Sequence, residues 1–142
     1  MEPLDAAALP DAALVLVDSA PIIYVLEGHP KLAQRFRPLF DRHAKSEIAF
    51  AVTTVTIAEV LTGPLTAGNE ALVKRYRAVL ESWQVIELTA DIAESAARLR
   101  ASLKIKLPDA IQAASAIVIN ADALVTHDRD FSRVTGLRVI DR

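Results

Sequence analysis

Short apolar runs recur along the chain, with room for one or more helices between most of them. They are LVLV at 14–17, IAFAV at 48–52, VIEL at 85–88, ALV at 123–125 and LRVI at 137–140. Continuous runs of this length, with little alternation of polar and apolar positions, are typical of strands that are buried on both faces. The pattern therefore predicts five strands.

Several of the segments between these runs follow the helical repeat. Apolar faces are expected over residues 72–83 and 92–103, and their members are Leu72, Tyr76, Val79, Leu80, Trp83, Ile92, Ala96, Leu99 and Leu103. Further helices are expected around Glu59 and from Pro108, whereas 28–30 (GHP) and 63–69 (GPLTAGN) are typical of loops. Strands that alternate with helices predict an α/β domain with a central, mainly parallel five-stranded sheet flanked by helices.

The composition is typical of one domain in a reducing compartment. With 142 residues and 52% hydrophobic content, we expect a single domain over residues 14–142, preceded by a short N-terminal tail at 1–13. The absence of cysteine excludes disulfides and thiolate-bound metals. The acidic, proline-containing N-terminus differs from a secretory signal, and no apolar stretch approaches the roughly 20 residues of a membrane span. We therefore expect a cytoplasmic protein that does not associate with membranes.

The formal net charge of −2 gives no sign of a nucleic-acid partner. It argues only weakly against one, because acidic residues that hold a metal ion would not repel a phosphate backbone.

Four acidic residues lie where ligands bind in an open parallel sheet, beyond the carboxyl ends of the strands. Asp18 ends the first apolar run, Asp128 follows the fourth, Glu59 lies in the helix after the second, and Asp109 opens the helix in KLPDAIQAASA. Plainer explanations exist for some of them. Asp109 can complement the helix dipole, and Asp128 and Asp130 can face water in a turn.

The position of Glu59 in a helix that is apolar on nearly all sides indicates a metal site. We expect its carboxylate to be partly buried, and the same holds for Asp18 after LVLV. Buried carboxylates are costly unless they are paired with a cation, and clustered ones repel each other unless a divalent ion lies among them. Oxygen ligands select Mg²⁺ or Mn²⁺, and such a site supports phosphoryl transfer or hydrolysis, which makes it a candidate phosphodiesterase.

Four motifs resemble the PIN domain, in particular the VapC-type ribonuclease toxins of toxin–antitoxin pairs. They are LVDSAPIIYVLEG, TTVTIAEVLTGP, LKIKLPDAIQAASA, and LVTHDRDF followed by GLRVI, and their order and spacing agree over almost the whole chain. The resemblance implies a three-layer PIN-like fold and a metal-dependent endoribonuclease with Mg²⁺ or Mn²⁺ as cofactor and RNA as substrate. It also implies a homodimer and a small cognate antitoxin protein.

The resemblance carries the family's acidic quartet over to four positions, which are expected to bind the metal and to act in catalysis: Asp18, Glu59, Asp109 and Asp128. Ser19 and Thr126 match positions that usually carry hydroxyl side chains, and supporting roles are expected for them. Asp130 has variable counterparts and is expected to shape the turn. His127 occupies a variable position, and we expect neither a base nor a ligand there.

Basic and aromatic side chains suggest partners less specifically. Lys104, Lys106 and Arg129 flank the predicted site in sequence and could steer phosphates, although solubility explains them equally well. Tyr76 and Trp83 are large anchors suited to a dimer interface, or to the core.

Two other functions compete with the nuclease. A phosphoacceptor receiver domain has similar size and alternation, but needs an early pair of acids and a late lysine that this chain lacks at the matching places. A catalytically silent PIN scaffold is opposed by the intact quartet.

Overall fold

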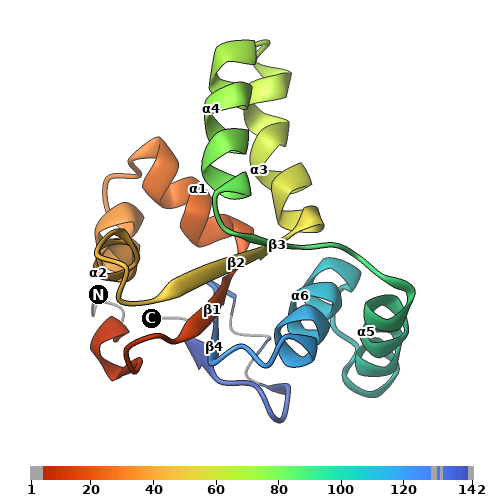
Figure 1. Cartoon of the computed structure of the whole chain (residues 1–142). Helices are drawn as coiled ribbons and strands as arrows, with labels where there is room; N and C mark the ends of the chain where they lie inside the picture. The colour runs from red at the N-terminus through yellow and green to blue at the C-terminus, as the bar shows by residue number, and fades with distance from the viewer. Residues whose placement is uncertain (1–4, 129–130, 132, 141–142) are drawn as a thin grey trace.

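A single parallel sheet forms the centre of the computed structural model, which describes residues 5–128, 131 and 133–140. Its strands are β1 (Leu14–Val17), β2 (Ala49–Thr53), β3 (Gln84–Ile86), β4 (Ala123–Val125) and β5 (Val139–Ile140). They lie in the order β3-β2-β1-β4-β5, and each neighbouring pair is parallel (Figure 1). The five predicted strands and the predicted α/β class are confirmed.

This strand order also excludes the receiver-domain alternative. Receiver domains have the flavodoxin-like order 2-1-3-4-5, in which the first strand lies between the second and third. Here β1 pairs with β2 and β4. The order of the strands therefore reverses between β1 and β4, because β2 and β3 lie on one side of β1, whereas β4 and β5 lie on the other. Open parallel sheets bind ligands in the crevice at the carboxyl ends of the two strands where the order reverses.

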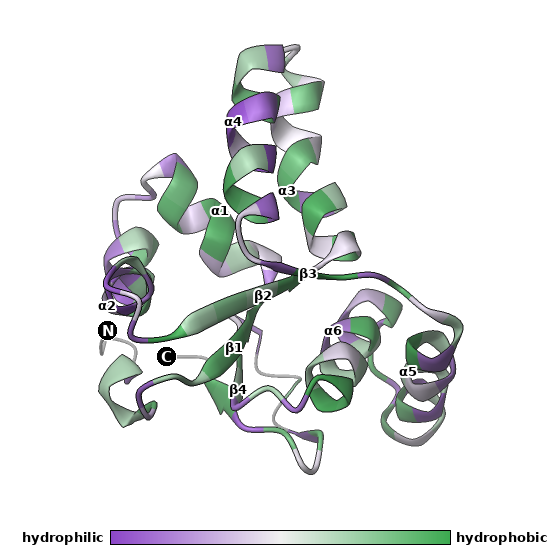
Figure 2. Cartoon of the chain, in the orientation of Figure 1, coloured by the Kyte–Doolittle hydropathy of each residue, from purple (hydrophilic) through white to green (hydrophobic). Residues whose placement is uncertain are grey.

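Helices cover both faces of the sheet. Those described are the 3-10 helix η1 (Ala6–Ala8), α1 (Ser19–Glu27), α2 (Leu32–Ala44), α3 (Thr54–Thr66), α4 (Glu70–Glu81), α5 (Ala90–Leu103) and α6 (Leu107–Val118). The alternation of side chains in β1 separates the two layers, since Val15 and Val17 pack in the core with α1 to α4, whereas Leu16 packs with α5 and α6. Figure 2 shows the largely hydrophobic strands between these layers. None of the helices in the described part of the chain is long and apolar enough to cross a membrane.

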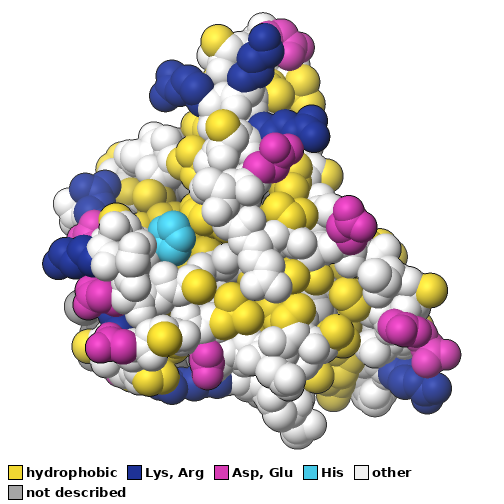
Figure 3. Space-filling model, viewed as in Figure 1, with side chains coloured by type: hydrophobic (Ala, Val, Ile, Leu, Met, Phe, Trp, Pro, Cys, Tyr) yellow, Lys and Arg dark blue, Asp and Glu magenta, His cyan; other side chains and the backbone are white. Residues whose placement is uncertain are grey.

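Helices α3 and α4 form a hairpin that projects from the sheet (Figure 1). The loop predicted at 63–69 is wrong over its first half, because α3 continues through Gly63 and Pro64 to Thr66. Proline removes one backbone hydrogen bond, but Pro64 is buried, and its packing supports this last stretch. Lys and Arg side chains gather over the far end of this hairpin (Figure 3).

Residues 5–13, expected as part of a tail, pack against the domain. The side chains of Ala6 and Leu9 are buried in the same core as Phe36. Arg42 of α2 donates to the carbonyl oxygens of Ala6 and Leu9 at 2.7 and 2.6 Å. It also forms an ion pair with Asp11 at 2.8 Å. The buried apolar side chains and this arginine hold the segment in place.

The aromatic side chains proposed as interface anchors lie in the core. Tyr76 and Trp83 are only 7% and 9% exposed, and Trp83 packs edge-on against Phe50 of β2 with ring centroids 5.1 Å apart. The sequence argument for a dimer interface at these two residues is therefore removed.

Candidate active site

Asp18 follows β1 and lies at the carboxyl edge of the sheet. Its backbone N–H still bonds the carbonyl of Val125 in β4 at 2.8 Å, and its side chain caps α1. Oδ1 accepts hydrogen bonds from the Ser19 N–H and from Gln112 Nε2, both at 2.9 Å, and Oδ2 accepts one from Thr126 Oγ1 at 2.8 Å. The residue is 9% exposed. Neutral donors from three elements or segments thus hold a nearly buried carboxylate in one orientation.

Glu59 of α3 lies close to Asp18 but is more exposed than its apolar helix suggests. Of that helix, only Thr56, Val60 and Pro64 are buried, and Glu59 is on the exposed side. Its pKa is nevertheless raised, first because part of the carboxylate is removed from water, and second because Asp18 is negative. A hydrogen bond with the Ser19 side chain lowers the pKa and partly offsets both causes. The two carboxylates therefore repel each other.

Thr126 connects Asp18 to Asp128. Its hydroxyl is fully buried, donates to Asp18 Oδ2, and accepts the backbone N–H of Asp128 at 3.0 Å. Asp128 itself is partly exposed. The chain therefore places these residues after β4 beside the end of β1, whereas Asp130 and Arg129 lie outside the described residues.

Helix α6 brings Asp109 to the same edge. Pro108 lies in its first turn, where a missing N–H costs little, and Asp109 follows with its Oδ2 atom buried. Gln112 comes three residues later, on the same side of the helix, and its amide reaches Asp18. Asp109 therefore lies one helical turn before a residue that hydrogen-bonds Asp18.

Sequence reasoning missed Gln112 and the two threonines that bond it, Thr53 and Thr56. A signal was present. Gln112 is a large polar residue within the apolar stretch 110–116, in which each residue proves to be buried. A buried amide needs hydrogen-bond partners, so its position one turn after Asp109 indicates a role beside the site.

His127 contacts aromatic side chains of α1 and α2. Its Nδ1 lies 2.9 Å from the hydroxyl of Tyr24, and its ring packs edge-on against those of Tyr24 and Phe36 at 5.4 and 6.2 Å between centroids. These contacts belong to α1 and α2. They give the imidazole a packing role.

The oxygen-rich edge fits a hard divalent cation. No three carboxylate or imidazole side chains of the described residues come together as one metal-binding group. Mg²⁺ does not require this, because it usually binds through one or two carboxylates, keeps several waters and takes further oxygens from substrate phosphates. Asp18 and Glu59 repel each other, and a cation between them would remove that repulsion. The donor set therefore suits Mg²⁺ or Mn²⁺ better than zinc or copper.

Comparisons with known proteins identify the family and the fold of the chain. No curated protein matches the sequence. A toxin–antitoxin complex from Klebsiella pneumoniae contains a chain that is 27% identical, with a TM-score of 0.69 over 87% of this chain and 94% of that one. A chain of VapBC-5 from Mycobacterium tuberculosis is 25% identical, with a TM-score of 0.62 over 92% and 99% of the two chains. A chain of VapBC2 from Rickettsia felis, solved with a promoter DNA fragment, is 20% identical with a TM-score of 0.70 over 89% and 96%, and supports the fold alone. The PIN domain profile matches residues 15–137, and the chain belongs to the PIN domain family.

Proposed function

We propose that this protein is a metal-dependent endoribonuclease that hydrolyses RNA phosphodiester bonds, and that it is the toxin of a type II toxin–antitoxin pair. The observation that carries the proposal is the arrangement of Asp18, whose carboxylate is fixed by neutral donors beside a second carboxylate, Glu59, with a raised pKa. Membership of the PIN family and similarity to chains of toxin–antitoxin complexes support it.

We assign the residues of the proposed mechanism as follows. Asp18 and Asp109 would hold Mg²⁺ or Mn²⁺ directly, and Glu59 and Asp128 directly or through water. A bound divalent ion supplies an activated water and neutralises charge on the leaving oxygen. Ser19 supports Glu59 through its hydroxyl, and Thr126 holds Asp18 through its own.

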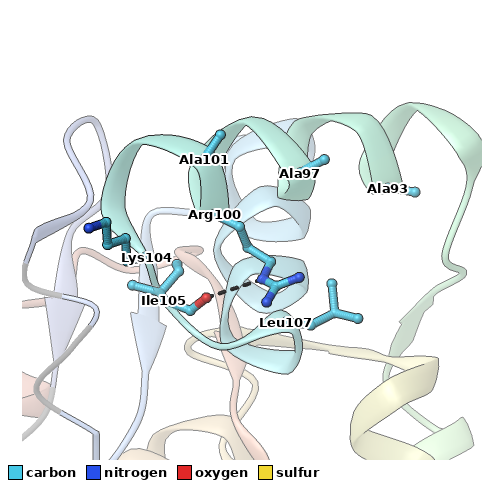
Figure 4. Close-up of a pocket in the computed structure, with 7 residues that line it drawn as sticks. All are labelled: Ala93, Ala97, Arg100, Ala101, Lys104, Ile105 and Leu107. Atoms are coloured by element: carbon cyan, nitrogen blue, oxygen red, sulfur yellow. Dashed lines mark hydrogen bonds between the residues drawn. The ribbon is translucent and has the colours of Figure 1, made fainter.

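A basic cavity offers a place for the RNA backbone. It has a volume of about 550 Å³ beside α5 and the start of α6, and it is lined by Arg100 and Lys104 together with small and apolar side chains. Figure 4 shows Arg100 extending from α5 toward Leu107, with its Nε donating to the carbonyl of Ile105 at 3.3 Å. Lys106 precedes α6, one turn before Asp109. These cations would attract phosphates toward the site.

Partners and location follow from the same proposal. A cognate antitoxin is inferred from the toxin–antitoxin complexes that contain similar chains. A homodimer is proposed by analogy with the family, and sedimentation that finds only a 15.4 kDa monomer at high concentration would contradict it. An enzyme that acts on RNA and pairs with an antitoxin would work in the cytoplasm.

The direct test is cleavage of single-stranded and looped RNA by the purified full chain. We expect cleavage with Mg²⁺ or Mn²⁺ and its loss when a chelator is added. Cleavage that survives the chelator would reject the metal mechanism. Failure both to bind Mn²⁺ and to cleave a broad RNA panel would favour the silent PIN scaffold instead. A crystal soaked in Mn²⁺ should show octahedral metal on Asp18 with oxygen distances near ~2.1 Å.

A further inference from the structure

We propose that Gln112 is a positioning residue that turns the Asp18 carboxylate so that its Oδ2 atom is the one presented to the metal, an inference that rests on the proposed function. Gln112 has a neutral side chain and is not among the expected ligands. Its role would be to determine which oxygen of Asp18 remains available.

The amide of Gln112 is fully engaged. It is 1% exposed, and its Nε2 atom donates to Asp18 Oδ1 at 2.9 Å and to Thr56 Oγ1 at 2.7 Å. Its Oε1 atom accepts the hydroxyl of Thr53 at 2.6 Å. Both amide hydrogens and the carbonyl oxygen are therefore bonded, and Gln112, Thr53 and Thr56 are all buried.

The orientation of this amide follows from its partners. An ionised carboxylate has no proton to donate, so the group that faces Asp18 must be the NH₂. If the amide were turned over, two acceptors would meet at Asp18. Thr53 is fixed as well, because its Oγ1 caps α3 by accepting the N–H of Thr56 at 3.1 Å. The end of β2 thereby fixes Gln112, and Gln112 fixes Asp18.

The consequence lies in the lone pairs of Asp18. A carboxylate offers about four acceptor sites, two on each oxygen. Among the described residues, the Ser19 N–H and Gln112 use Oδ1, whereas Thr126 alone bonds Oδ2. Oδ2 therefore keeps room for a cation. Rotation of an aspartate carboxylate about its last torsion is soft, so without Gln112 the two oxygens could exchange places or tilt away.

The first test replaces Gln112 with methionine, which has a similar length and no donor. Calorimetric titration of the full chain with Mn²⁺ should show affinity lowered by about 10- to 100-fold, the usual effect of removing a group that orients a metal ligand. Ser115→Ala is the matched control, because Ser115 is also buried and lies on the next turn of α6. It should bind Mn²⁺ within about twofold of the wild type. A folded Gln112→Met chain with wild-type affinity would overturn the inference.

A second pair of variants changes Thr53, which bonds Gln112 and not Asp18. Thr53→Val removes the hydroxyl that holds the Gln112 amide, whereas Thr53→Ser keeps it. We expect Thr53→Val to bind Mn²⁺ more weakly than the wild type, and Thr53→Ser to bind it as the wild type does. Thr53→Val also loses the cap of α3, so it should melt at a lower temperature. Equal Mn²⁺ affinity of the two variants, measured well below both melting temperatures, would contradict the proposal.

Two readouts separate this inference from the proposed function. Crystals of metal-free Gln112→Met should show Asp18 displaced from Thr126, which is independent of RNA cleavage. If wild-type protein cleaves RNA and binds Mn²⁺ while Gln112→Met keeps both the Asp18 orientation and the affinity, only the positioning role fails. If wild-type protein neither binds Mn²⁺ nor cleaves RNA, the proposed function itself fails.

Discussion

Asp18→Asn is the most informative single substitution, because the structure predicts that it removes charge without removing shape. The asparagine oxygen must occupy the place of Oδ1, since two donors, the Ser19 N–H and Gln112 Nε2, point at it. The NH₂ group then faces Thr126, whose hydroxyl can turn from donor to acceptor and still accept the Asp128 N–H. The contacts of residue 18 with Ser19, Gln112 and Thr126 can therefore be kept, and only the hydroxyl hydrogen of Thr126 needs another acceptor.

The expected loss of cleavage rate is much larger than the expected change in stability. Removing an anionic metal ligand should slow RNA cleavage at least ~100-fold, which corresponds to about 2.7 kcal/mol of transition-state stabilisation. Stability should stay the same or rise by less than about 1 kcal/mol, because the repulsion relieved is with an exposed carboxylate, Glu59, and solvent screens it. Activity should therefore fall sharply while folding is preserved.

The assay compares wild type and Asp18→Asn on one fluorescent RNA with saturating Mg²⁺, alongside thermal unfolding of both metal-free chains. Asp130→Asn, at a residue that the sequence predicts only to shape a turn, is the control and should have a mild effect. A rate for Asp18→Asn within about tenfold of wild type, in a protein that unfolds normally, would refute the assignment of Asp18 as a metal ligand.

Three further predictions test individual contacts. Asp18→Asn should lower the pKa of Glu59, measured by carbon-detected NMR, but not to its ordinary value, because the partial removal of its carboxylate from water is the larger cause and remains; an unchanged pKa would mean that the carboxylates are far apart. His127→Ala should keep activity within about threefold and cost about 1–2 kcal/mol of unfolding free energy, since it loses a hydrogen bond and ring contacts; a large loss of rate would restore a catalytic histidine. Arg100→Ala with Lys104→Ala should reduce the salt dependence of RNA binding by roughly 1.4 in log–log slope if both contact phosphates, and an unchanged slope would place the RNA elsewhere.

Strand positions were predictable because buried parallel strands leave a simple signal. Continuous apolar runs gave β1, β2 and β4 to within one residue at each end. Helices α1 and α2 were not assigned. Helix α1 is apolar on several sides and so gave no clean repeat, whereas α2 has a clear apolar face but contains Pro38, which usually breaks a helix. The length of α3 was underestimated for a related reason, because Gly63 and Pro64 resemble a loop in sequence and their tertiary support is visible only in three dimensions.

Asp18 was predictable for a physical reason that Gln112 does not share. An acid directly after a buried apolar run has to lie at the edge of the sheet, and that edge is where parallel sheets bind ligands. Gln112 is instead defined by partners that are 94, 56 and 59 residues away in sequence, and local patterns carry no information on which of these contacts form. The buried polar residue itself was a sign that partners must exist, because an unbonded amide in the core costs about 1–3 kcal/mol.

The position of the site follows from the reversal of the strand order between β1 and β4. Their parallel pairing in register, Val17 with Val125, brings Asp18 and Thr126 side by side one residue later. Residues more than 100 positions apart thus share one hydrogen bond because two strands end at the same level. A substitution that shifted β4 by one residue would turn Thr126 to the other face of the sheet, since successive side chains in a strand alternate. Asp18 would then lose the donor on the oxygen that we propose to bind metal, even with all four acidic residues unchanged.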